Sequence, residues 1–246
     1  MLEEHIKIES NHGDITAYLA KPESRAPGII LIHEVWGLTE HMMDVAGRLA
    51  KEGYCVVAPD LLSQTGIHKL VDQNIMKEVM NPATRDEAQK KLRAAMAPLQ
   101  APEFGGQTVD KLKTCFEYLK NMNFCTGNVA VMGFCFGGTY SYSLALAEPE
   151  LAAAVVFYGH APQPIDKIEA INCPVLVFNG EKDENLMKQL PEVKAAAEKF
   201  GKNFKFHEYP NAGHAFFNDS NAVLYRQDAA EDAWQITLKF LKKHVS

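Results

Sequence analysis

The sequence predicts an α/β fold, with a mostly parallel central sheet of about eight strands, helices on both faces and an antiparallel N-terminal hairpin. Two observations predict it. Continuous apolar runs such as residues 28–32 are typical of strands that are buried on both faces of a sheet. In the second half of the chain, apolar runs alternate with segments of helical periodicity, which implies crossover connections between parallel strands.

The elements follow in order along the chain. A hairpin comes first, because alternating apolar residues at Ile6 and Ile8 and again over 15–19 flank a turn at 11–14. Apolar runs predict the later strands, at residues 28–32, 54–58, 128–132, 153–158, 175–178 and 204–209. Helical periodicity predicts helices over residues 40–51, 84–96, 108–119, 191–200 and 222–243. A further helix, rich in small residues, is expected directly after Gly138.

Residues 61–82 show neither the apolar runs of a strand nor the periodicity of a helix, apart from one short helical stretch near 69–80. We interpret them as a surface excursion of the kind that often lines a binding site. The rest of the chain shows no compositional break, and 246 residues with 47% hydrophobic content suffice for one large core. A single domain over residues 1–246 is therefore expected.

Charge and hydropathy limit the classes of partner. The net charge of −6 and the absence of a basic cluster argue against nucleic acid as a partner. Glu3 and Glu4 stand where a secretory signal would carry positive charge, and no apolar run approaches the roughly 20 residues that cross a bilayer. We expect a cytoplasmic protein with no membrane partner that is a monomer or a weak homo-oligomer.

The five cysteines predict reduced thiols, since they are odd in number and include no C-x-x-C pair. No histidine follows them at the spacing of a zinc site, so no metal is expected. Four of them lie in apolar or strand-flanking positions, where cysteine usually acts as a small buried hydrophobe. Cys135 differs because glycines surround it.

The motif Gly133-Phe134-Cys135-Phe136-Gly137 has the pattern of a nucleophile elbow, G-x-[S/C]-x-G, and lies between a predicted strand and a predicted helix. Its glycines avoid collisions in a strained turn. The start of the following helix would stabilise a thiolate. The alternative is an unreactive buried cysteine in a glycine-rich turn.

An acid and a base follow two later strands. Asp183 comes after the strand at 175–178, and His214 comes after the strand at 204–209. Nucleophile, acid and base thus follow separate strands in the chain order of α/β-hydrolases. Glu181 or Glu184 could compete as the acid, and His160 also follows a strand.

The sequence resembles the dienelactone hydrolase family over essentially its whole length. The resemblance is carried by residues 133–138, Asp183, 211–214, 33–37 and 59–61. It implies an α/β-hydrolase fold and cleavage of the ester bond of a small lactone or ester. It also implies that Glu34 is a buried glutamate that contacts the resting thiol and takes part in its activation.

The same resemblance sets expectations for the substrate pocket. Arg85 matches an arginine that holds a substrate carboxylate, whereas Gln89 replaces an aromatic hydroxyl and Asn218 stands where a second arginine belongs. Ala215 replaces a hydroxyl residue. Half of the family's anion clamp is therefore missing. The other side chains expected at the pocket, besides the excursion, are Trp36, His160 and Phe216.

The expected chemistry needs no cofactor. The Cys135 thiolate attacks an acyl carbon while the amides of Phe136 and Val35 stabilise the oxyanion, and His214 then activates water against the acyl-thioester. Thiolate leaves more readily than an unprotonated amine, so esters, lactones and thioesters are favoured over amides. The alternatives are a non-catalytic binding protein on the same scaffold and a general carboxylesterase or thioesterase with another substrate.

Overall fold

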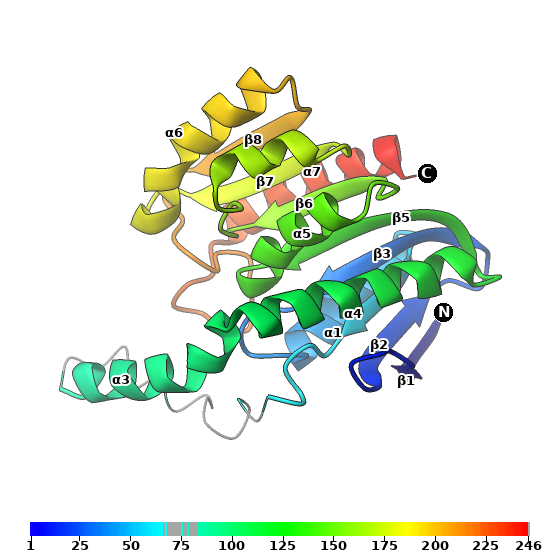
Figure 1. The fold of residues 1–246 in the computed structure, drawn as a ribbon, viewed down its shortest axis with the longest axis horizontal. Coiled ribbons are helices and arrows are strands. Elements are labelled where there is room, and N and C mark those ends of the chain that lie inside the picture. The colour runs from blue at the N-terminus through cyan, green and yellow to red at the C-terminus, as the bar shows by residue number, and fades with distance from the viewer. Residues whose placement is uncertain (66, 68–74, 76–77, 79–82, 246) are drawn as a thin grey trace.

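A computed structural model describes residues 1–65, 67, 75, 78 and 83–245 (Figure 1). Eight strands form one sheet in the order β1-β2-β4-β3-β5-β6-β7-β8. The strands are β1 (Leu2–Ile8), β2 (Ile15–Lys21), β3 (Ala26–Ile32), β4 (Cys55–Pro59), β5 (Cys125–Phe134), β6 (Ala153–Phe157), β7 (Val175–Gly180) and β8 (Phe204–Tyr209). β2 pairs antiparallel with β1 and β4, and the pairs from β4 through to β8 are parallel. The predicted fold class is confirmed.

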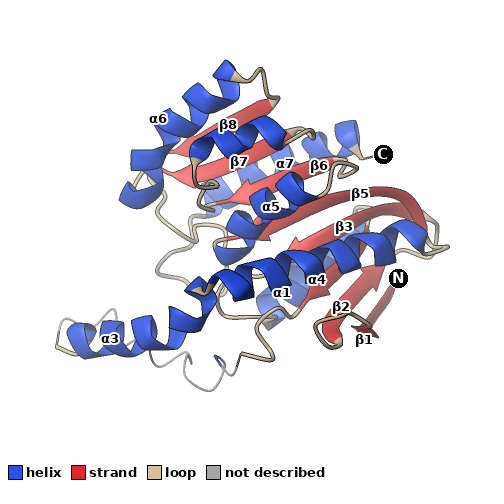
Figure 2. Ribbon diagram, in the orientation of Figure 1, coloured by secondary structure: helices blue, strands red, loops and turns tan. Residues whose placement is uncertain are grey.

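Helices cover both faces of the sheet (Figure 2). The α-helices in the described residues are α1 (Glu40–Lys51), α3 (Arg85–Met96), α4 (Pro102–Asn121), α5 (Phe136–Ala147), α6 (Glu184–Lys199) and α7 (Gln227–His244). Short 3₁₀ segments are η2 (Ala97–Gln100) and η3 (Ile165–Ala170). None of these helices combines the length and the apolar character that a bilayer span requires.

The apolar run of β3 shows how the two layers form. Ile30 and Ile32 face a core built with α4, α5 and α6, whereas Ile29 and Leu31 face a second core built with α1 and α7. All four side chains are fully buried, because successive residues of a strand point to opposite faces. The continuous apolar run therefore reflects burial on both sides.

The helix boundaries differ from the prediction where proline and turns intervene. α6 begins at Glu184, and Pro191 lies inside the helix, because Leu186 and Leu190 already bury an apolar face before it. α4 begins at Pro102, a residue type suited to the first turn of a helix. α7 begins only at Gln227. The helical stretch expected near 69–80 falls mostly outside the described residues.

The turn between β5 and α5 leaves no room for side chains at its glycines. Cys135 alone separates the two elements, with a positive φ of 55°. A Cβ atom at Gly133 would lie 2.1 Å from the carbonyl oxygen of Gly137, and one at Gly137 would lie 2.2 Å from that of Ile32. β3, β5 and α5 thus meet backbone to backbone, as the motif predicted.

We predict that Gly137→Ala destabilises the protein by about 1 to 3 kcal/mol. The added Cβ would collide with the backbone of Ile32, which cannot move aside as a flexible side chain would. Gly106→Ala is the matched control, since no atom lies within 4 Å of its added Cβ and the residue is in α4. It should stabilise by roughly 0.5 to 1 kcal/mol. Chemical unfolding of both variants measures the difference, and equal effects would contradict the packing argument.

Candidate active site

The C-terminal ends of three parallel strands bring Cys135, Asp183 and His214 together. They follow β5, β7 and β8 respectively. The Nδ1 atom of His214 lies 2.5 Å from Oδ2 of Asp183, and His214 and Cys135 line the same cavity. The imidazole therefore bonds to the carboxylate and lies on the same cavity wall as the thiol.

Of the three acids that the sequence offered, Asp183 is the one whose carboxylate contacts the His214 imidazole. Its side chain is 10% exposed, whereas Glu181 and Glu184 are exposed residues. Asp183 occupies the N-cap position of α6, so the start of that helix fixes its backbone. His160 is exposed at the end of β6, and its ring contacts Gln189 instead of a carboxylate.

The charges of Asp183 and His214 support one another. Burial acts to lower the pKa of His214, but its hydrogen bonds to Asp183 and Cys135 outweigh that effect and raise the pKa to about 10. Burial likewise acts to raise the pKa of Asp183, and the hydrogen bond and charge of His214 reverse this to a net lowering. Both shifts favour an ionised carboxylate facing an imidazolium.

The other cysteines are unsuited to nucleophilic chemistry. Burial raises the pKa of Cys115 and of Cys173 to about 12. Cys55 and Cys125 lie fully buried beside β3, and burial raises their pKa values as well. Cys135 alone among the five is partly exposed, at the N-cap of α5.

A buried histidine for which the sequence predicted no role positions the two candidate oxyanion donors. Nδ1 of His33 lies 2.6 Å from the backbone oxygen of Glu34, and Nε2 accepts the N–H of Leu61 at 3.0 Å. The ring also stacks on Phe136 with centroids 5.7 Å apart. His33 therefore holds the loop that carries Val35 against the first residue of α5, whose N–H has no acceptor within the helix.

Glu34 is buried, as expected, and two side chains of the protein donate hydrogen bonds to it. Its side chain accepts hydrogen bonds from Asn218 at 2.7 Å and from Tyr158 at 3.3 Å. Burial raises its pKa, and these donors and two histidines only partly oppose that shift. Glu34 thus makes hydrogen bonds to Asn218 and Tyr158, and its contact with the resting thiol stays a prediction.

Asn218, which stands where the resemblance places a second arginine, faces inward. The residue is 8% exposed, its amide nitrogen donates to Glu34, and its oxygen accepts from Ser220 at 2.6 Å. Both ends of the side chain are thus engaged inside the protein. The sequence contained no signal for this, because an asparagine at a loop position fits many hydrogen-bond patterns.

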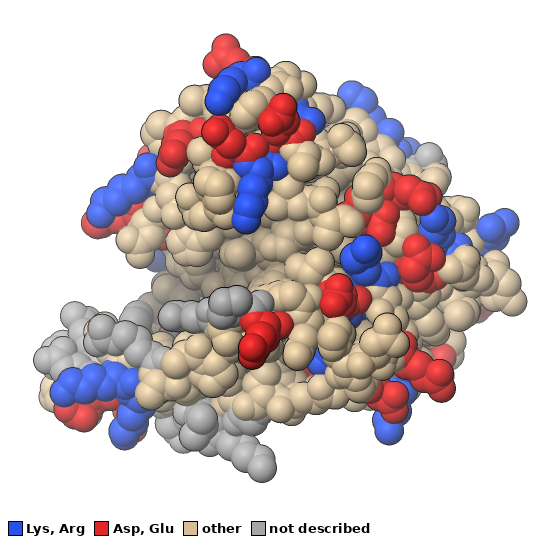
Figure 3. All heavy atoms as spheres, viewed as in Figure 1, with Lys and Arg blue, Asp and Glu red and all other residues tan. Residues whose placement is uncertain are grey.

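A cavity of about 880 Å³ opens beside the candidate site. Its lining consists of Val35, Met96, Leu99, Gly105, Gly106, Val109, Asp110, Cys135, Phe136, Thr139, Tyr140, Ser143, Tyr158, His160 and His214. Figure 3 shows the molecule hollowed above α4, and the described atoms that face the hollow are mostly neither acidic nor basic. Cys135 and His214 reach the cavity, and both candidate oxyanion residues line it.

Of the remaining residues predicted for the pocket, some line the cavity and others do not. His160 lines the cavity as expected. Phe216 does not, because it is fully buried among Phe157, Tyr158 and Tyr209, so its assignment to the pocket is wrong. Trp36 packs instead on the small core that includes Leu62 and Ala88. Arg85 begins α3, but its side chain lies outside the described part of the chain, and Gln89 does not line the cavity.

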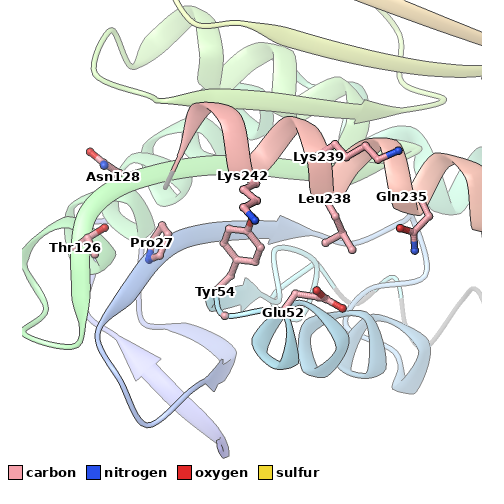
Figure 4. A pocket seen from close by; sticks show the side chains of 10 residues that line it. Pro27, Glu52, Tyr54, Thr126, Asn128, Gln235, Leu238, Lys239 and Lys242 are labelled. Atoms are coloured by element: carbon pink, nitrogen blue, oxygen red, sulfur yellow. The ribbon is translucent and has the colours of Figure 1, made fainter.

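A second cavity of about 510 Å³ lies at the opposite end of the sheet (Figure 4). It opens between α7 and the starts of β3, β4 and β5, where Tyr54, Leu238 and Lys242 line it. Cys135, Asp183 and His214 do not line this second cavity. Across the described residues, no group of three or more His, Cys, Asp or Glu side chains gathers as metal ligands would.

Known proteins match this chain over nearly its whole length. The model of the dienelactone hydrolase family matches residues 15–245. A protein of Saccharolobus solfataricus, provisionally named a carboxymethylenebutenolidase, is 33% identical over 98% of this chain and 99% of its own length. The Usf protein of Aquifex pyrophilus is 32% identical over 98% of both chains.

A solved structure has the same fold over nearly the whole chain. A protein of Klebsiella pneumoniae, provisionally described as a dienelactone hydrolase, superposes with a TM-score of 0.82 and 25% identity, covering 99% of both chains. Its fold and the family match both extend over nearly the whole sequence. The chain therefore belongs to the dienelactone hydrolase family, within the α/β-hydrolase superfamily, and is a carboxylic ester hydrolase.

Proposed function

We propose that the protein cleaves the ester bond of a small lactone, ester or thioester through Cys135, His214 and Asp183, with an acyl-thioester intermediate. One observation carries the proposal: His214 bonds to Asp183, and the His214 imidazole and the Cys135 thiol both line a cavity large enough for a small substrate. The position of Cys135 at the start of α5 supports a thiolate there.

In the proposed cycle the Cys135 thiolate adds to the acyl carbon, and the amides of Phe136 and Val35 receive the developing oxyanion. The tetrahedral intermediate collapses, the His214 imidazolium protonates the leaving alkoxide, and the acyl group stays on sulfur. Neutral His214 then removes a proton from water, which attacks the thioester. Release of the carboxylate product regenerates the thiolate and the imidazolium.

The roles of the surrounding groups follow from their positions. Asp183 fixes the ring of His214 and stabilises its charge. Glu34 places a second carboxylate close to the imidazolium from the protein interior, where Asn218 and Tyr158 hold it. His33 positions the loop of Val35. No step in this cycle draws on a group outside the chain and water.

The lining of the cavity suits a substrate whose binding depends little on a carboxylate. Its described lining contains no lysine or arginine, and its carboxylate is Asp110, which pairs with His12 at 3.0 Å. Asn218, at the position of the family's second arginine, is engaged with Glu34. Arg85 is the remaining candidate cation for a substrate carboxylate.

We predict that Cys135→Ala abolishes hydrolysis and leaves the fold intact, because the turn depends on Gly133 and Gly137 rather than on the thiol. Mixing wild type with an activated aryl ester should release one equivalent of phenol in a burst, as the acyl-enzyme accumulates. Cys115→Ala is the control and should keep turnover. Full activity in Cys135→Ala would exclude this nucleophile, and the absence of any acyl-enzyme would favour a binding protein.

A second prediction concerns the acid and the pH dependence. Because the pKa of His214 is raised to about 10, the imidazolium persists through neutral pH and is lost as the pH rises through that value. We therefore expect kcat/KM to fall on the alkaline side near pH 10, since this ratio reports the free enzyme. Asp183→Asn should move that fall to lower pH and reduce turnover by roughly 10⁴-fold.

Glu181→Gln is the matched control for this prediction, because Glu181 is exposed and only two residues away. Its pH profile should match that of wild type. The reverse ranking of the two variants would assign the acid to Glu181.

A third prediction concerns the substrate carboxylate. One charge-assisted hydrogen bond from Arg85 would contribute on the order of 1.5 to 3 kcal/mol, so a carboxylated ester should exceed its neutral analogue in kcat/KM by only about tenfold to a hundredfold. Arg85→Ala should remove that preference and spare the neutral ester. A preference above roughly a thousandfold would require a second cation at the cavity.

A further inference from the structure

Two adjacent glycines near the start of α4, Gly105 and Gly106, line the cavity beside Cys135. Gly105 already belongs to the regular helix, because its N–H donates to the backbone oxygen of Ala101 at 3.3 Å. Glycine gives up more conformational freedom than alanine when a helix forms, so each glycine lowers the stability of α4. The cycle proposed above uses neither residue.

The backbone does not require glycine at these two positions. Neither residue has a positive φ. At the elbow, a Cβ atom on Gly133 would lie 2.1 Å from a backbone oxygen, whereas one on Gly105 would lie 3.8 Å from the nearest described atom beyond the helix backbone, the hydroxyl oxygen of Tyr140. A Cβ atom on Gly106 would have no described atom within 4 Å beyond that backbone. What glycine provides at both positions is therefore open space in the cavity.

This space lies between α4 and α5, which pack against one another and lie side by side in Figure 1. The residues of α5 that line the cavity share one face of the helix, at the spacing i, i+3, i+4 and i+7, and are Phe136, Thr139, Tyr140 and Ser143. They extend over about 10 Å of the helix axis, since each residue rises by about 1.5 Å. The space between these four residues and Gly105, Gly106 and Val109 of α4 is here called the α4–α5 groove.

The walls of the α4–α5 groove favour an apolar chain. On one wall the rings of Phe136 and Tyr140 contact each other with centroids 4.6 Å apart, and Val109 contributes an apolar side chain to the other. No lysine or arginine of the described residues lines it. An apolar chain that left water for this groove would therefore be stabilised by burial.

The position of His214 decides which half of an ester lies in this groove. His214 follows β8, which lies at one edge of the sheet beyond β6 and β7, whereas α4 packs on β3 and β5. His214 and α4 therefore lie on opposite sides of β5, the strand that precedes Cys135. In the proposed cycle His214 protonates the leaving alkoxide, so the alcohol half points toward β8 and the acyl half points toward α4.

We propose that the α4–α5 groove is the acyl subsite of this ester hydrolase, and that Gly105 and Gly106 keep it wide enough for an extended apolar acyl chain. The two glycines are then specificity-determining residues, which act on the choice of substrate and take no part in the bond-breaking steps. The inference rests on the proposed function, since it takes Cys135 as the nucleophile and His214 as the group that protonates the leaving alkoxide.

The first test uses 4-nitrophenyl esters with acyl chains from acetyl to octanoyl, so that the leaving group stays constant. In wild type, kcat/KM should rise with chain length, by up to about fourfold for each methylene that the groove buries. Gly105→Leu fills the space opposite Tyr140 and should lower the octanoate-to-acetate ratio of kcat/KM by at least about tenfold. Gln107→Leu adds the same side chain at an exposed position outside the cavity lining and should keep the wild-type ratio. An unchanged ratio in Gly105→Leu would overturn the proposal.

The second test varies the alcohol instead, with acetate esters of straight-chain alcohols from ethanol to octanol. The dependence of kcat/KM on alcohol length should be the same in Gly105→Leu as in Gln107→Leu, because the alcohol half points away from α4. A loss confined to the long alcohols would assign the groove to the leaving group. An equal loss in both series would assign it to neither half, and either result would overturn the acyl assignment.

Gly105→Ala keeps the proposal testable if the leucine side chain prevents folding. This variant should unfold at a higher urea concentration than wild type, because alanine favours a helix and its methyl group fits the groove. It should also lower the octanoate-to-acetate ratio, by less than leucine does. A lower unfolding midpoint would mean that the backbone needs glycine there, against the inference. Failure of the proposed nucleophile would appear separately, as ester turnover in Cys135→Ala.

Discussion

The close approach of three backbones at the end of β5 is the constraint on which the rest of the site depends. Gly133 and Gly137 let β5, β3 and α5 meet without intervening side chains, which forces the residue between strand and helix into a positive φ. That conformation directs the Cys135 side chain out of the sheet toward the cavity. The strain is tolerated because the surrounding packing fixes the turn from both sides.

The sequence was most informative where a residue type has one physical use. Continuous apolar runs located the parallel strands, and the order of Cys135, Asp183 and His214 after separate strands indicated a common edge of the sheet. It was least informative for side chains whose partners are distant in sequence, as with Asn218 bonding to Glu34 or His33 to Leu61. Phe216 was misplaced because an aromatic residue beside a candidate histidine suits a core as well as a pocket.

Burial divides the polar side chains near the site into two kinds. Asp183 and His214 are partly exposed and support one another by direct contact. Glu34, His41 and Asn218 lie beneath them, where polar groups depend on partners because water does not compensate them. None of the three lines the cavity beside Cys135, so a substrate there meets only the outer group.

The site and the wall of its cavity come from different parts of the chain. The candidate nucleophile, acid and base follow strands of the sheet, whereas much of the wall comes from residues 96–110, at the ends of α3 and α4. Replacing a wall residue therefore alters which acyl groups fit without disturbing the reacting groups. A family built this way can diversify its substrates over evolution while a single chemical apparatus is inherited unchanged.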